Sequence, residues 1–141
     1  MHQKRLIREE ITIHALTSKV WNVLICPEYT RQYLFEGDVI SEWTKGSPIV
    51  YQSEIDGKSQ IIKKGSIEEV IPGLALKFSL SDLQETNNNH AIVTYELFPE
   101  EGGINLRMTQ EILLPNPELY NIIVDNWKMV LKKIKWLAEY S

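Results

Sequence analysis

Few side chains in this sequence have the chemistry of a nucleophile, a general base or a metal ligand, and those few are scattered. His2, His14 and His90 lack the short spacing that would let two imidazoles share one zinc ion. Cys26 lies at a predicted helix N-terminus, where a thiol pKa tends to fall, but no histidine is near it in sequence to act as a base. We therefore predict a structural cysteine, a solvated His90, no catalytic residue, no metal and no cofactor.

Glu68 and Glu69 are adjacent acids inside a predicted strand. Neighbouring side chains in a strand point to opposite faces, so the two carboxyls cannot serve one site as acid and base. One of them is expected to point inward. That isolated acid keeps a cyclase-like or hydrolase-like enzyme open as an alternative.

Polar residues that face inward are a different signal. Gln110 shares the alternation phase of Leu106 and Met108, so its amide is predicted to face the interior, where an unpaired amide costs about 1 to 3 kcal/mol. It needs a partner, a water or a ligand, and we expect Gln110→Leu to weaken ligand binding without lowering stability. Ser53, in phase with Tyr51, is a second such candidate. Few polar groups among apolar ones are typical of a small-molecule site.

The predicted ligand-binding residues lie on strands and on the last helix, so that they form two facing walls. They are Tyr51, Ser53, Phe78, Tyr95, Met108, Gln110, Ile123 and Trp127. Each aromatic side chain buries on the order of 150 to 250 Å². The alternative stays open that these side chains fill the interior and leave no site.

Alternating apolar residues predict an α+β chain in which one sheet is followed by one long helix. Residues 11–15 form a first strand, and short helices begin near Thr17 and at Pro27. Six more strands are separated by Gly, Pro or Asn turns, at 39–43, 49–55, 61–71, 74–80, 91–98 and 104–113. Asn116 is the predicted N-cap of a helix that runs to Tyr140, about 36 Å long. The short turns predict an antiparallel meander.

Composition sets the class of protein. With 141 residues, 43% hydrophobic and 24% charged, the chain suits one globular domain, 1–141. A net charge of −4 argues against a nucleic-acid partner, which needs a basic face. No apolar run approaches the ~20 residues that span a bilayer. One cysteine and no signal sequence favour the cytoplasm.

The long helix carries two apolar stripes. The first is expected to cover the sheet and contains Leu119, Tyr120, Ile123, Val124, Trp127, Val130, Leu131, Ile134, Leu137 and Ala138. The second gathers on the opposite side and contains Ile122, Met129, Trp136 and Tyr140. Two interpretations of the second stripe stay open: burial by the same domain, or a homodimer seam through Ile122, Met129 and Trp136.

Several motifs along the chain resemble those of a known family. They are Lys19-Val20-Trp21, Pro27-Glu28, the run from Ser41 to Ile49, the alternation from Gly65 to Phe78, Val93 to Leu97, Leu106 to Gln110, and Trp127 to Leu137. Together they resemble the START-like (SRPBCC) superfamily, and within it the homologues of the activator of heat shock protein 90 ATPase. The resemblance implies the helix-grip fold, in which a curved antiparallel sheet wraps around a long C-terminal helix and leaves a ligand cavity between them.

Two departures limit what the resemblance carries over. The eukaryotic co-chaperone has a separate N-terminal domain that does much of its chaperone binding, and this sequence contains no counterpart, so chaperone binding is not carried over. Asn126 stands where family members usually place a glycine before the helix tryptophan. The resulting hypothesis is non-enzymatic binding of a small hydrophobic or amphipathic molecule. A protein-interaction module and a cyclase-like enzyme are the alternatives.

Overall fold

The computed structural model describes residues 3–34, 37–82, 90–114 and 117–141 of the chain. One strand, β1 (Gln3–Ile13), precedes two short helices, α1 (Thr17–Ile25) and α2 (Pro27–Tyr33). Six strands follow: β2 (Asp38–Ser41), β3 (Pro48–Ile55), β4 (Lys58–Ile71), β5 (Ala75–Asp82), β6 (His90–Glu100) and β7 (Gly103–Leu114). The helix α3 (Leu119–Tyr140) completes the predicted order of elements.

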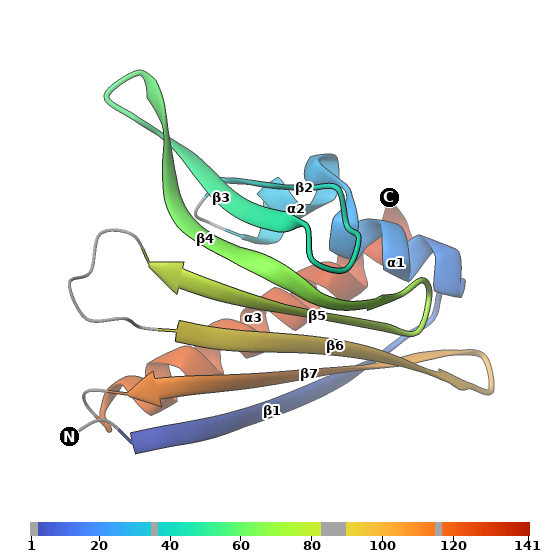
Figure 1. Ribbon diagram of the computed structural model, residues 1–141. Coiled ribbons are helices and arrows are strands. Elements are labelled where there is room, and N and C mark those ends of the chain that lie inside the picture. Colours follow the sequence, from blue (N-terminus) through green and yellow to red (C-terminus); the bar gives the residue numbers. More distant parts are fainter. Residues whose placement is uncertain (1–2, 35–36, 83–89, 115–116) are drawn as a thin grey trace.

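The seven strands form one antiparallel sheet in the order β1-β7-β6-β5-β4-β3-β2. Strands β2 to β7 follow one another as the predicted meander, and β1 joins the far edge beside β7. Figure 1 shows α3 crossing behind the curved sheet, with α1 and α2 near its C-terminal end. This is the predicted α+β helix-grip arrangement.

The core lies between the sheet and α3, because the apolar phase of each strand points to that side. Leu76, Phe78 and Leu80 of β5 are buried, as are the matching residues of β6 and β7. Two residues depart from this alternation. Leu74 is exposed because it lies in the turn before β5, and Ser79, of the other phase, is buried where its hydroxyl lies 3.4 Å from that of Ser66.

Irregular pairing bends the sheet. The register of β3 and β4 shifts between Tyr51 and Gln52, and that of β4 and β5 shifts between Ile67 and Glu69. Such bulges increase local twist and curvature. Between them, Gly65 approaches its neighbouring strand so closely that a Cβ atom there would lie 1.6 Å from the carbonyl oxygen of Ser79. Only glycine fits this position.

Most predicted boundaries hold within a few residues, but two ends were wrong. β1 starts at Gln3, well before residue 11, because the charged residues Arg5 and Glu9 interrupt its inward apolar phase. α3 begins at Leu119, after a turn at Pro117 and Glu118, and the predicted cap Asn116 lies outside the described residues, as does the 87–89 turn. Among the helices described, none is long and apolar enough to cross a membrane.

Candidate functional site

The structure brings the predicted aromatic residues together on the concave side of the sheet. Tyr51 of β3, Phe78 of β5, Tyr95 of β6 and Met108 of β7 are all buried there. The ring of Tyr95 lies centrally, with its centroid 6.4 Å from that of Phe78 and 6.1 Å from that of Trp127 on α3. The contact with Trp127 is edge-on, a geometry that aromatic pairs favour. Tyr95 therefore connects the two walls, sheet and helix.

Gln110 has the partner that the sequence required. The indole Nε1 of Trp127 donates a hydrogen bond of 2.7 Å to Oε1 of Gln110. This bond orients the side-chain amide, because its oxygen is the acceptor and its nitrogen points away from Trp127. Within the described part of the chain, that amide nitrogen donates to no other residue. A fixed and unused donor therefore remains at the inner face.

Tyr95 presents a second unused polar group. Its side chain is 4% exposed, and its hydroxyl forms no hydrogen bond with the described residues. Burial raises the pKa of this phenol well above its ordinary value, so the hydroxyl stays protonated and can donate. Tyr95 lies opposite Met108 in the β6–β7 pairing, and Gln110 is two residues further along β7. Tyr95 and Gln110 are thus diagonal neighbours on one face of the sheet.

Burial of the sheet-facing stripe of α3 is less complete in its N-terminal half. In the C-terminal half, the sheet-facing side chains of Val130, Leu131, Ile134 and Leu137 are buried. In the N-terminal half, the side chains on the same stripe are only half-buried, although they pack against the core: Tyr120, Ile123, Val124 and Trp127. These side chains lie on one stripe of the helix, so their change from buried to half-buried shows that the sheet covers the N-terminal half of α3 less than the C-terminal half.

Ser53 and Ile123 are less buried than the aromatic residues of the sheet. Ser53 is half-buried on β3 beyond the bulge at Tyr51 and Gln52, and Ile123 is half-buried on α3. The predicted set therefore falls into two groups. Four members are buried, while Ser53, Gln110, Ile123 and Trp127 are half-buried.

Sequence reasoning missed two charged residues on the concave side. Lys63 of β4 pairs with Tyr51, and its Nζ lies 5.8 Å from the centre of the Tyr51 ring. Glu9 of β1 lies opposite Met108, and its carboxylate is 3.9 Å from Nζ of Lys128 on α3. Alternation from Ile67 and Gly65 places Lys63 on the same inward face, but the bulge beside Lys63 breaks the pattern.

The candidates for acid–base chemistry do not come together. Glu68 and Glu69 are both exposed, so the expectation that one points inward was wrong. The bulge explains the error: Ile67 and Glu69 pair with Phe78 and Lys77, and Glu68 is the extra residue between them.

The other candidates for chemistry are also dispersed. The side chain of His14 is exposed, with Nδ1 3.4 Å from the carbonyl oxygen of Gly102. Cys26 is a half-buried free thiol between α1 and α2. His2 is not among the described residues, nor is the side chain of His90. In the described ranges, no three His, Cys, Asp or Glu residues gather as a metal site.

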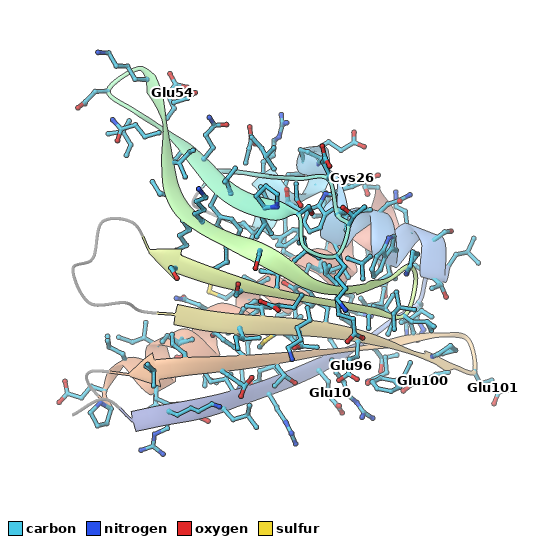
Figure 2. The ribbon with its side chains drawn as sticks, in the orientation of Figure 1. Glu10, Cys26, Glu54, Glu96, Glu100 and Glu101 are labelled. Atoms are coloured by element: carbon cyan, nitrogen blue, oxygen red, sulfur yellow. The ribbon has the colours of Figure 1, made fainter. Side chains whose placement is uncertain are left out.

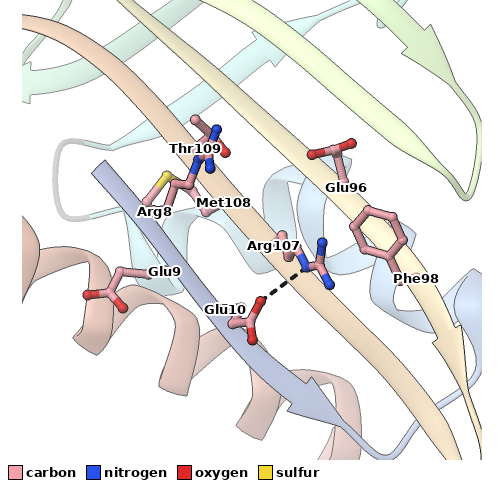
Figure 3. Close-up of a pocket in the computed structure, with 8 residues that line it drawn as sticks. All are labelled: Arg8, Glu9, Glu10, Glu96, Phe98, Arg107, Met108 and Thr109. Carbon is pink, nitrogen blue, oxygen red and sulfur yellow. Dashed lines mark ion pairs between the residues drawn. The ribbon is translucent and has the colours of Figure 1, made fainter. Parts of the chain in front are cut away.

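The convex side carries a depression of about 530 Å³ over β1, β7 and β6 (Figure 3). Figure 2 shows Glu10 and Glu96 on this side of the sheet. Arg107 fills its centre, with Nε 3.1 Å from the carboxylate of Glu10 and its guanidinium 4.3 Å from the centre of the Phe98 ring. Arg107 also donates to Oδ1 of Asn105. The guanidinium of Arg107 is thus already engaged by Glu10 and Phe98. Of the predicted site residues, only Met108 lines this depression.

Comparisons with known proteins agree with this architecture. A family model described as Activator of Hsp90 ATPase homolog 1-like protein matches residues 14–139. The chain belongs to this family. The resemblance read from the motifs is therefore confirmed. No curated protein matches the chain.

Solved structures share the fold of this chain. ChR145 from Cytophaga hutchinsonii is 28% identical, with a TM-score of 0.80 over 96% of this chain and 94% of that chain. The Aha1 dimer from Colwellia psychrerythraea is 15% identical, with a TM-score of 0.76 over 96% and 97%. Ara h 8.0201 is 12% identical, with a TM-score of 0.70 over 94% and 96%. The helix-grip fold is thus common to proteins of very different sequence.

Proposed function

We propose that this chain binds a small hydrophobic or amphipathic molecule between the concave sheet and α3, without catalysing a reaction. The molecule enters at the half-buried end of α3 and rests against Tyr51, Phe78, Met108 and Ile123. Shape and apolar contact supply most of the affinity, and the Tyr95 hydroxyl and the Gln110 amide supply its polar contacts, with Ser53 and Trp127 at the rim. Such a pattern of few polar groups in apolar surroundings is typical of ligand sites.

One observation carries this proposal: two unused donors face the interior at the point where cover by the sheet decreases. No buried side-chain N or O atom of the described residues lacks a hydrogen-bond partner, so both unpartnered donor atoms reach accessible space. Trp127 holds the Gln110 amide with its nitrogen free, and Tyr95 keeps its hydroxyl protonated. A ligand acceptor can therefore reach either donor, and each hydrogen bond to it contributes about 0.5 to 1.5 kcal/mol net. The Activator of Hsp90 ATPase homolog 1-like fold supports the proposal, since it places a long helix over a concave sheet.

Native mass spectrometry of protein purified without denaturant tests for a bound molecule. We expect an adduct that organic extraction removes, and a protein with only its own mass, unable to bind an added apolar probe, would count against the proposal. Fluorescence titration with 8-anilino-1-naphthalenesulfonate supplies that probe. Tyr95→Phe removes one oxygen atom and should weaken a ligand that carries an acceptor by about fivefold, the equivalent of one neutral hydrogen bond. Trp136→Phe, on the opposite stripe of α3, is the matched control and should leave the affinity unchanged.

A protein-interaction role is the second candidate, and a specific observation favours it. The outer stripe of α3 exposes Ile122, Met129 and Trp136, each more than half accessible. Exposed apolar residues of this size favour an interface. We infer self-association through these residues as the form of this role, supported by the fold shared with a protein whose structure is an Aha1 dimer. The single free thiol, Cys26, supports a reducing compartment such as the cytoplasm as its place of action.

A further inference from the structure

The outer face of α3 carries apolar residues at regular intervals. Ile122, Met129 and Trp136 are 56%, 56% and 51% exposed and lie seven residues apart, and Tyr140, 72% exposed, lies on the same face. The ring of Trp136 packs against Tyr140 at 6.2 Å and lies under Nζ of Lys133 at 4.7 Å. A seven-residue repeat keeps one stripe in register with a second helix that packs at a shallow angle.

We propose that two copies of the chain pair α3 against α3 in antiparallel orientation, with the two-fold axis passing beside Met129. This rests on the self-association proposed above and specifies its geometry. Ile122 and Trp136 are equally distant in sequence from Met129, so the axis places Ile122 of one copy against Trp136 of the other. The largest apolar side chain on the stripe thereby packs against a smaller one at both ends, and Met129 packs against itself.

Charge complementarity selects this orientation. Asp125 and Lys132 flank the same side of the stripe, and the two-fold axis brings Asp125 of one copy within one residue, about 1.5 Å along the helix, of Lys132 of the other, twice per dimer. In their own chain neither forms an ion pair with a described residue. Other lysines of α3 do have partners, since Lys128 contacts Glu9 and Lys135 contacts Glu139. A parallel pairing would leave Asp125 of one copy about 10.5 Å from Lys132 of the other along the helix, so neither ion pair would form.

The size of the stripe also suits a second copy. Its four side chains expose on the order of 500 Å² per copy, so pairing buries roughly 1,000 Å² in all, near the lower bound for a specific interface. The predicted dimer is therefore weak, and its assembly depends on concentration. The stripe lies on the side of α3 away from the sheet, so pairing leaves the concave site open.

Single-cysteine crosslinking tests the geometry, in a Cys26→Ser background so that no other thiol is present. Met129→Cys, on the axis, should form a covalent dimer under mild oxidation. Ile122→Cys is the matched control: in the antiparallel pair its two copies lie about 21 Å apart along the helix, beyond disulfide reach. Crosslinking at Ile122 as well as at Met129 would indicate a parallel pair and overturn the proposal.

A charge exchange tests the same geometry without a covalent bond. Asp125→Lys should weaken the dimer by at least about threefold in sedimentation equilibrium, since two exposed ion pairs become repulsive, and Asp125→Lys with Lys132→Asp should restore it. A wild type that stays monomeric at every concentration overturns both self-association and this geometry. A wild-type dimer without Met129→Cys crosslinking overturns the geometry alone. Trp136→Glu, as a monomer, should still bind the fluorescent probe, which separates both results from the ligand proposal.

Discussion

The hydrogen bond between Trp127 and Gln110 makes a measurable prediction about how the helix is attached to the sheet. The bond is 2.7 Å long, both side chains are half-buried, and it joins α3 to β7. A neutral hydrogen bond of this kind contributes a net 0.5 to 1.5 kcal/mol, so we expect a coupling of about 1 kcal/mol between the two residues. A double-mutant cycle with Gln110→Leu, Trp127→Phe and the double variant isolates that coupling.

The two single variants should differ in how much they lower the free energy of unfolding. Gln110→Leu leaves the indole N–H of Trp127 without its partner and should lower the free energy of unfolding by about 1 kcal/mol. This revises the expectation from sequence, in which leucine did not lower stability because no partner for Gln110 was known. Trp127→Phe also shortens the ring that contacts Tyr95 edge-on, so about 2 to 3 kcal/mol should be lost.

Urea denaturation followed by far-ultraviolet circular dichroism measures all four proteins. The double variant should be less destabilised than the sum of the two single variants, by about 1 kcal/mol, the free energy of the shared bond. Additive effects within about 0.3 kcal/mol would show that the bond does not hold the helix in solution. In that case the Gln110 amide is not fixed, and the reasoning that makes it a ligand donor fails.

Three further predictions concern the frame around the site. Hydrogen bonds from Lys135 and from the backbone of His14 lower the pKa of Glu139. In urea titrations above about pH 4.3, the free energy of unfolding of the wild type should therefore exceed that of Glu139→Gln by about 1 kcal/mol. The difference should vanish as the pH falls through the lowered pKa. Tyr33→Phe removes the hydroxyl that donates to the carbonyl of Val23 at 2.8 Å and should cost about 1 kcal/mol in the same titration. Gly65→Ala should lower the thermal midpoint by several degrees in calorimetry, because its Cβ atom has no space.

Each of these has an outcome that would contradict it. A pH-independent difference for Glu139→Gln would mean that the carboxylate is not held by its two donors. Full stability of Tyr33→Phe would show that the carbonyl finds water instead. An unchanged midpoint for Gly65→Ala would mean that β4 and β5 are further apart at this point than the structure places them.

Much of the fold follows from local patterns in the sequence. Alternation in β5, β6 and β7 fixes their inner face, so Phe78, Tyr95 and Met108 were correctly placed inside. Pro27 marks the start of α2, because its fixed φ suits the first helical position. The two apolar stripes of α3 lie about half a turn apart around the helix, so one packs against the sheet and the other is exposed.

Other features depend on contacts that no local pattern contains. The partner of Gln110 lies seventeen residues away on another element, so only the docking of α3 reveals it. Lys63 and Glu68 were missed or misplaced because bulges shift the phase of β4, and a bulge has no sequence rule as firm as alternation. The start of β1 was predicted too late in the chain because charged residues interrupt its inward apolar phase.

The most direct test of ligand binding follows individual side chains in solution. In nuclear magnetic resonance spectra of the ¹⁵N-labelled protein, the four tryptophans give four indole signals, and Trp127→Phe and Trp136→Phe assign two of them. Titration with 8-anilino-1-naphthalenesulfonate should shift the indole signal of Trp127 and the side-chain amide of Gln110 with one saturable curve. The signal of Trp136 should stay unchanged. Saturable shifts confined to Trp136, or no saturable shift at Trp127, would contradict a binding site between the sheet and α3.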